Sequence, residues 1–155
     1  MRRLWNCSKL NDSFPPDVPA GLRLRFDVGV DPEVRGSYMR FARWLRKEYV
    51  FPRRIFVHLC DSETVISRGG MQVASLFWGP YNKKEAPYIR IATGDYQEMI
   101  ASIGKYNALT TDLHSMTLQL SYYFQWIQDL PESAQQARYY AENVLLDYLD
   151  QTERL

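Results

Sequence analysis

Histidine and cysteine are the side chains in this 155-residue chain that most readily bind metal or act as nucleophiles. His58 and Cys60 are separated by one residue in a predicted strand, so they share a face and could contact a metal ion together. No second pair of potential ligands accompanies them. His114 stands alone on a predicted helix, which is typical of a hydrogen-bonded structural histidine. These positions alone do not predict a metal site.

Other common catalytic motifs are absent from the sequence. It contains neither the G-x-S-x-G nucleophile motif nor the G-x-x-x-x-G-K-[S/T] phosphate-binding loop. Gly69-Gly70 is typical of a turn. Asp61 and Glu63 lie near a predicted turn, where surface acids are far commoner than catalytic acid pairs.

The longest regular pattern runs from Asn107 to Leu130 without proline or glycine. Its apolar residues recur every three or four positions, which predicts one continuous buried face of an α-helix. That face consists of Leu109, Leu113, Met116, Leu120, Phe124 and Ile127. A second line on the same helix consists of Thr111, His114, Leu118, Tyr122 and Gln125.

Leu118 and Tyr122 lie one helical turn apart, at the spacing of the two zinc-binding histidines in an H-E-x-x-H motif. The chain has Leu118-Gln119-Leu120-Ser121-Tyr122 here. Catalytic zinc needs three ligands from His, Cys, Asp or Glu and an open position for water. Leucine has no donor atom, neutral tyrosine is a poor ligand, and the Gln119 amide cannot accept a proton near neutral pH. A motif shifted to His114 fails too, since it would need Glu at 115 and His at 118. We therefore expect no bound metal or other cofactor.

The first half of the chain predicts a strand and a helix. Alternating residues indicate a half-buried strand over 22–28, with Leu22, Leu24, Phe26 and Val28 facing inward. Asp31-Pro32-Glu33 is typical of a helix start with Asp31 as the N-cap, and Pro52 marks the end. The expected buried stripe of this helix is Val34, Tyr38, Phe41, Ala42, Leu45 and Tyr49.

Three further strands are predicted over residues 54–59, 72–78 and 88–92. Short loops favour antiparallel pairing, although the strand, helix and strand of the first half could form one parallel pair. Helices are predicted over 96–103, capped by Asp95 and stopped by Gly104, and over 131–151. The last helix would pack through Ala134, Ala137, Ala141, Leu145 and Tyr148. The order predicts an α+β fold, with a small antiparallel or mixed sheet of about four strands and helices on one face.

Length and composition predict one domain over residues 21–155, preceded by an irregular N-terminal arm over 1–20 that Leu4 and Trp5 could tie down. With 46% hydrophobic residues, the chain can bury a core without disulfides, and its two cysteines are expected to be reduced. It shows no signal-peptide pattern and no long apolar run, so we expect a cytoplasmic protein without membrane contact.

Charge is unevenly distributed although the net charge is only +1. Residues 1–54 hold 12 basic and 6 acidic side chains, whereas residues 55–155 hold 7 and 12. Arg40, Arg43 and Lys47 line the expected solvent side of the first helix. They could dock an acidic partner, although a helix face of this kind is usually just solvated.

Four stretches resemble a family of small bacterial and prophage proteins of the zincin-like metallopeptidase type. They are Leu22-Arg23-Leu24-Arg25-Phe26, Phe41-Ala42-Arg43-Trp44-Leu45, the segment from Pro87 to Tyr96, and Tyr123-Phe124-Gln125-Trp126. The similarity extends from about Leu22 to Tyr148. Such relatives read H-E-L-S-H-Y-F-Q-W before a helix similar to the one around Gln136-Ala137. The resemblance implies a zincin-like fold in which Leu118 and Tyr122 replace the two histidines and Gln119 replaces the glutamate. It places the third, acidic ligand at Ala134, with Glu132 two residues away.

These observations favour a catalytically inactive zincin-like domain that binds, regulates or neutralises another protein, as immunity or antitoxin-like proteins do. One alternative is a metal-independent hydrolase that uses Tyr122, His114 or Gln119 in the cleft where the zinc ion of such relatives would lie. The least favoured alternative is nucleic-acid binding through the basic helix face, since the chain is nearly neutral and has no recognition motif. The candidate partner-binding residues are Arg40, Arg43, Lys47, His114, Gln125 and Trp126.

Overall fold

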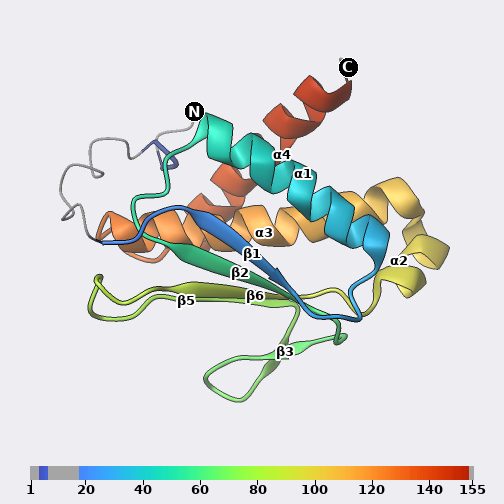
Figure 1. The fold of residues 1–155 in the computed structure, drawn as a ribbon, viewed down its shortest axis with the longest axis horizontal. Coiled ribbons are helices and arrows are strands. Elements are labelled where there is room, and N and C mark those ends of the chain that lie inside the picture. Colours follow the sequence, from blue (N-terminus) through green and yellow to red (C-terminus); the bar gives the residue numbers. More distant parts are fainter. Residues whose placement is uncertain (1–3, 7–17, 154–155) are drawn as a thin grey trace.

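A computed structural model describes residues 4–6 and 18–153 of the chain. The described part is an α+β fold with a mixed sheet and helices packed against it (Figure 1). In chain order the elements are β1 (Leu22–Phe26), α1 (Pro32–Glu48), β2 (Ile55–Cys60), β3 (Val65–Ile66), β4 (Gln72–Val73), β5 (Ser75–Trp78), β6 (Tyr88–Ala92), α2 (Tyr96–Ile103), α3 (Lys105–Ile127) and α4 (Ala134–Glu153).

The main sheet has four strands in the order β1-β2-β6-β5. β1, β2 and β6 are parallel, and β5 pairs antiparallel with β6 at the edge. The parallel β1–β2 pair and the antiparallel β5–β6 pair agree with the sequence-based expectation. The parallel β2–β6 pair does not, because the chain between these strands forms β3, β4 and β5 and so provides the long crossover that parallel pairing needs.

All four helices lie on one side of the main sheet, and the small β3–β4 hairpin lies on the other side (Figure 1). The helix-side residues of the strands and the apolar faces of α1, α3 and α4 form one core. At its centre the parallel strands contribute the fully buried residues Ile55, Val57, Leu59, Ile89 and Ile91. The apolar face of α3 is thus packed against the helix side of the sheet.

The helix predictions are largely confirmed. The Asp31 carboxylate accepts a hydrogen bond from the Glu33 N–H at 2.8 Å and caps α1 as expected, and the whole predicted stripe of this helix is buried. On α3 the predicted face is buried except at its first residue, Leu109, which is partly buried. Asp95 precedes α2 but its side chain forms no capping hydrogen bond. Its backbone carbonyl instead accepts the first bond, from Met99.

Further details of the sequence-based prediction are wrong. β1 ends at Phe26, and Val28 lies in a turn with 98% of its surface exposed. The stretch 72–78 is two strands rather than one, since Gln72–Val73 pairs with β3 and Ser75–Trp78 pairs with β6. The last helix begins at Ala134 rather than at Pro131, and Ala134 is exposed, whereas the other four predicted packing residues of this helix are buried.

The N-terminal residues Leu4 and Trp5 are buried against α3, as expected. The Trp5 indole donates a hydrogen bond to Ser121 Oγ at 3.0 Å, and the Gln128 side chain donates one to the Leu4 carbonyl at 2.7 Å. Most of the predicted irregular arm, residues 1–3 and 7–17, lies outside the described residues.

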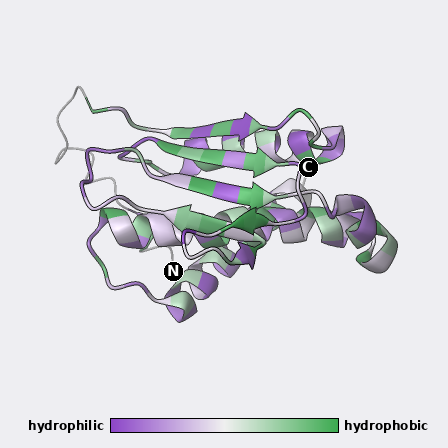
Figure 2. Ribbon diagram, turned by 90° about the horizontal axis from the view of Figure 1, so that it is seen from below, coloured by the Kyte–Doolittle hydropathy of each residue, from purple (hydrophilic) through white to green (hydrophobic). Residues whose placement is uncertain are grey.

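The sheet face opposite the helices is only partly covered (Figure 2). The β3–β4 hairpin packs over one end of it, where Cys60, Val65 and Ala92 are buried together. The remainder of this face is half-exposed. None of the described helices combines the length and apolar composition needed to cross a membrane.

Candidate functional site

A cleft of about 260 Å³ lies between the edge strand β5 and the helix α3. Three of the residues singled out from the sequence, Tyr122, Gln125 and Trp126, line it. Its other lining residues are Phe77, Trp78, Gly79, Leu130 and Glu132. The structure therefore places a concave surface at one of the two positions where the resemblance expects a zinc ligand.

Polar contacts fix α3 against β5. The Gln119 side-chain amide donates to Ser75 Oγ at 2.9 Å, and the Trp126 indole donates to the Pro80 carbonyl at 2.9 Å. The Trp126 ring also packs edge-on against Phe77, with centroids 6.1 Å apart. Gln119 thus ties α3 to β5, and Trp126 forms a fixed wall of the cleft.

Gly79 is a cleft residue that the sequence analysis did not identify. A Cβ atom at this position would lie 2.5 Å from Trp126 Cδ1, so only glycine lets the strand end approach the indole this closely. The signal in the sequence is the Gly79-Pro80 pair directly after a predicted strand.

Gln125 holds the start of α4 beside the cleft. Its amide nitrogen donates to the Ser133 carbonyl and to Gln136 Oε1, both at 2.9 Å, and its oxygen accepts from the Ser133 N–H at 3.2 Å. The side chain is almost fully buried, with 2% exposed. Its hydrogen-bonding groups are therefore used within the protein, and its effect on a partner would come through Glu132, which it helps to position.

The cleft does not fit a catalytic zinc ion. Leu118, one turn before Tyr122 on α3, offers no donor atom, and the Gln119 amide is bonded to Ser75. Burial, and then the nearby Glu132 carboxylate, raise the pKa of the Tyr122 phenol, so this side chain is neutral near pH 7. Glu132 lines the cleft and Ala134 does not. One carboxylate cannot replace three ligands, and a neutral phenol is also a poor base or nucleophile.

The remaining predicted residues lie away from the cleft. Arg40, Arg43 and Lys47 are exposed on the outer surface of α1, which packs over β1 at the opposite edge of the sheet (Figure 1). His114 is half-buried on α3, two turns before Tyr122, and does not line the cleft. The structure thus separates the basic helix face from the cleft.

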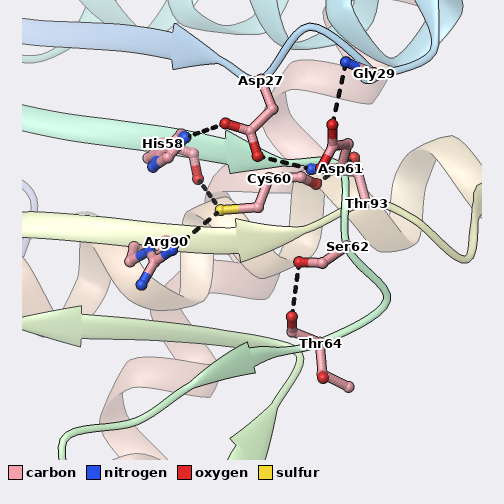
Figure 3. Close-up of polar contacts among 9 residues, drawn as sticks. All are labelled: Asp27, Gly29, His58, Cys60, Asp61, Ser62, Thr64, Arg90 and Thr93. Atoms are coloured by element: carbon pink, nitrogen blue, oxygen red, sulfur yellow. Dashed lines mark hydrogen bonds and ion pairs between the residues drawn. The ribbon is translucent and has the colours of Figure 1, made fainter.

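A second polar cluster lies at the end of β1 and β2, on the sheet face opposite the helices (Figure 3). Asp27 Oδ1 lies 2.7 Å from His58 Nε2, and the potential ligand atoms of Asp27, His58 and Cys60 all lie within 4.8 Å of one another. Asp27 Oδ2 accepts from the Asp61 N–H at 3.1 Å. The hydrogen bond from His58, and then the one from the Asp61 backbone, lower the pKa of Asp27.

The sequence placed His58 and Cys60 together but gave no reason to add Asp27. Asp27 joins them because β1 and β2 run parallel with Phe26 opposite Leu59, so the residue after β1 reaches the end of β2. A parallel β1–β2 pair was expected, and this register was the missing information.

The cluster has the residue types of a metal site, and it is the one such group of three within residues 4–6 and 18–153. Its surroundings oppose a cation. Cys60 is buried under the β3–β4 hairpin, and this burial raises the pKa of its thiol. The Arg90 guanidinium lies 3.9 Å from Cys60 Sγ. A buried thiol beside a positive charge makes a weak ligand set.

Comparison of the chain with protein-family models, with curated proteins and with solved structures gives no match.

Proposed function

We propose that the protein is a catalytically inactive zincin-like domain that binds an extended segment of another protein along β5, with one of its side chains in the β5–α3 cleft. The observation that carries this proposal is an edge strand with free backbone groups directly beside a pocket. The resemblance to zincin-like proteins supports it, since Tyr122 of the former ligand pair lines that pocket.

The outer edge of β5 is available for pairing. β5 is the last strand of the sheet, and the Ala92 N–H donates to the Ala74 carbonyl at 2.9 Å just before β5 begins. Hydrogen-bonded pairs alternate along antiparallel strands, so the backbone groups of Ser75 and Phe77 point away from β6. An extended peptide can add to such an edge through main-chain hydrogen bonds, while a side-chain pocket supplies specificity.

The cleft chemistry defines the kind of side chain that fits. Phe77 and Trp126 provide ring surfaces, and Tyr122 and Glu132 provide a phenol and a carboxylate at one end. The side chain that fits both the ring surfaces and the polar end is aliphatic or aromatic, with a hydrogen-bond donor or a positive charge at its tip. A binding site built on rigid elements, without metal or an activated nucleophile, suits a regulatory or neutralising protein of the immunity or antitoxin type.

Selection of a phage-displayed random peptide library against the purified protein tests this proposal. We expect binders that share one such side chain, and Tyr122→Ala to weaken their affinity at least tenfold, since central interface tyrosines typically contribute this much. Tyr106→Ala is the matched control, because Tyr106 is exposed on the same helix about 24 Å away.

The position of the bound peptide is read from backbone amide NMR shifts. We expect the largest changes at Ser75 and Phe77, because only their N–H groups face an added strand. Binders that tolerate Tyr122→Ala and leave both amides unchanged would contradict the proposal.

A further inference from the structure

The exposed part of the sheet face opposite the helices (Figure 2) carries basic and aromatic side chains and no acidic strand residue. Strand residues alternate between the two faces, and those on the helix side are the core residues described above. The strand positions on the opposite face, leaving out the three beneath or beside the β3–β4 hairpin, are Arg23, Arg25, Phe56, His58, Tyr88, Arg90 and Trp78.

The strand register arranges these residues in two rows. Arg25, His58 and Arg90 are direct neighbours across β1, β2 and β6. Arg90 and Arg25 form no ion pair with a described carboxylate, and the nearest acid of the cluster, Asp27, is engaged by His58. Arg25 and Arg90 thus flank His58 from β1 and β6, and their two positive charges on one face can attract an anion.

The second row is aromatic. Phe56, Tyr88 and Trp78 are neighbours across β2, β6 and β5, and the Trp78 and Tyr88 ring centroids lie 5.2 Å apart. The Arg25 guanidinium lies 4.1 Å above the Phe56 ring, and that of Arg68, from the β3–β4 hairpin, lies 4.7 Å above Trp78. A guanidinium group thus covers one face of the Phe56 ring and one face of the Trp78 ring, and the rest of this half-exposed row remains accessible.

A cavity of about 340 Å³ lies where the two rows meet. It is lined by Arg25, Phe56, His58, Tyr88 and Arg90, with Ala86 and Pro87 at its border. Its volume is in the range of small-molecule sites, and it contains both positive charge and flat apolar surface.

We propose that this face binds single-stranded nucleic acid, with backbone phosphates at Arg25 and Arg90 and bases stacked on the row formed by Phe56, Tyr88 and Trp78. Single strands are bound by this combination of basic groups and stacking rings, whereas the bases of a duplex are not free to stack. An acidic peptide would match the arginines but leave the ring row unused. The row spans three strands, which is more than one base needs. This site is separate from the basic helix face of α1, and it shares only Trp78 with the β5–α3 cleft.

Fluorescence anisotropy with labelled 12-nucleotide oligo(U) and oligo(dT) tests the proposal. We expect binding that weakens with salt, and Arg25→Gln/Arg90→Gln to lower affinity at least tenfold at 50 mM NaCl and to reduce the slope of log K against log salt by about 1.4. Tyr88→Ala should lower affinity at least fivefold at every salt concentration, because stacking is not a counterion effect.

Arg40→Gln/Arg43→Gln is the matched control, since it removes the same charge from the exposed face of α1. It should leave affinity within twofold of the unchanged protein, and thermal unfolding of each variant verifies the fold. Equal losses in the two double variants would overturn the proposal. Binding of UMP, or of a 12-residue poly-aspartate peptide, as tight as that of the oligonucleotides would also overturn the proposal, because the aromatic row would then contribute nothing specific to a nucleic-acid strand.

Discussion

Asp112→Asn is expected to raise the free energy of unfolding at pH 8 by about 2–4 kcal/mol. Asp112 lies on α3 with 4% of its surface exposed, and its Oδ2 atom has no hydrogen-bond partner among the described residues. Burial, and then the charge of Asp95, raise the pKa of this carboxyl to about 7. Asparagine has nearly the same shape and carries no charge at any pH, so it removes the cost of a buried carboxylate.

The pH dependence has a definite sign. The unfolded Asp112 loses its proton near pH 3.8, while the native state keeps the proton until about pH 7. Between these values the native state binds more protons, so the contribution of Asp112 to stability is complete below pH 3.8 and is lost as pH rises to 7. At about 1.4 kcal/mol per pH unit the loss reaches about 4 kcal/mol at most.

Urea unfolding at pH 4.5, 6 and 8 measures this effect. The stability difference between Asp112→Asn and the unchanged protein should grow with pH and level off above pH 7. Glu63→Gln, which neutralises an exposed acid, serves as the control and should show no such trend. A difference for Asp112→Asn that is the same at all three pH values would contradict the assignment.

Trp5→Ala is expected to destabilise the protein by about 3–5 kcal/mol, the usual range for removing a fully buried aromatic side chain. The Trp5 ring has no exposed surface and contacts the rings of Tyr49 and Phe124, with centroids 5.0 and 4.8 Å away. Its loss would also leave Ser121 on α3 without the indole donor. The N-terminal residues are therefore part of the core.

Thermal and urea unfolding of two further variants provide a graded comparison. Trp5→Phe keeps one aromatic ring but loses the indole N–H and the volume of the second ring, so it should cost less than Trp5→Ala, about 2–3 kcal/mol. Met71→Ala, at a residue with 68% of its surface exposed, should change stability by less than about 0.5 kcal/mol. If Trp5→Ala were as mild as Met71→Ala, the N-terminal residues would not pack as described.

Periodicity in the sequence predicts the helices well because it reports directly on burial. The stripe of α1 and the long face of α3 are examples, since each is set by spacing along one element. The prediction that Val28 faces inward is wrong because the alternating pattern continues into a turn after β1 has ended. The sequence does not predict the break at Ala74 or the parallel β2–β6 pair, because both depend on which distant strand each segment pairs with.

The candidate sites are likewise predicted only where their residues lie on one element. The sequence points to the α3 residues of the cleft, and it leaves Ala134 and Glu132 open as positions for the third acid. Only the structure brings Glu132 to the cleft, because Gln125 fixes the start of α4 there. Asp27, Gly79 and Asp112 were missed because each depends on a neighbour far away in the sequence.

Zinc content, measured by elemental analysis after purification in zinc-containing buffer without a histidine tag, tests the proposed zincin-like character of the cleft directly. The unchanged protein should hold less than about 0.1 zinc per chain, because the cleft offers a single carboxylate. Leu118→His/Tyr122→His should hold about one zinc per chain, since it restores two histidines one helical turn apart and the one at position 122 lines the cleft with Glu132. Near-stoichiometric zinc in the unchanged protein, or none in a folded double variant, would contradict the proposal that the cleft is a zinc site without its ligands.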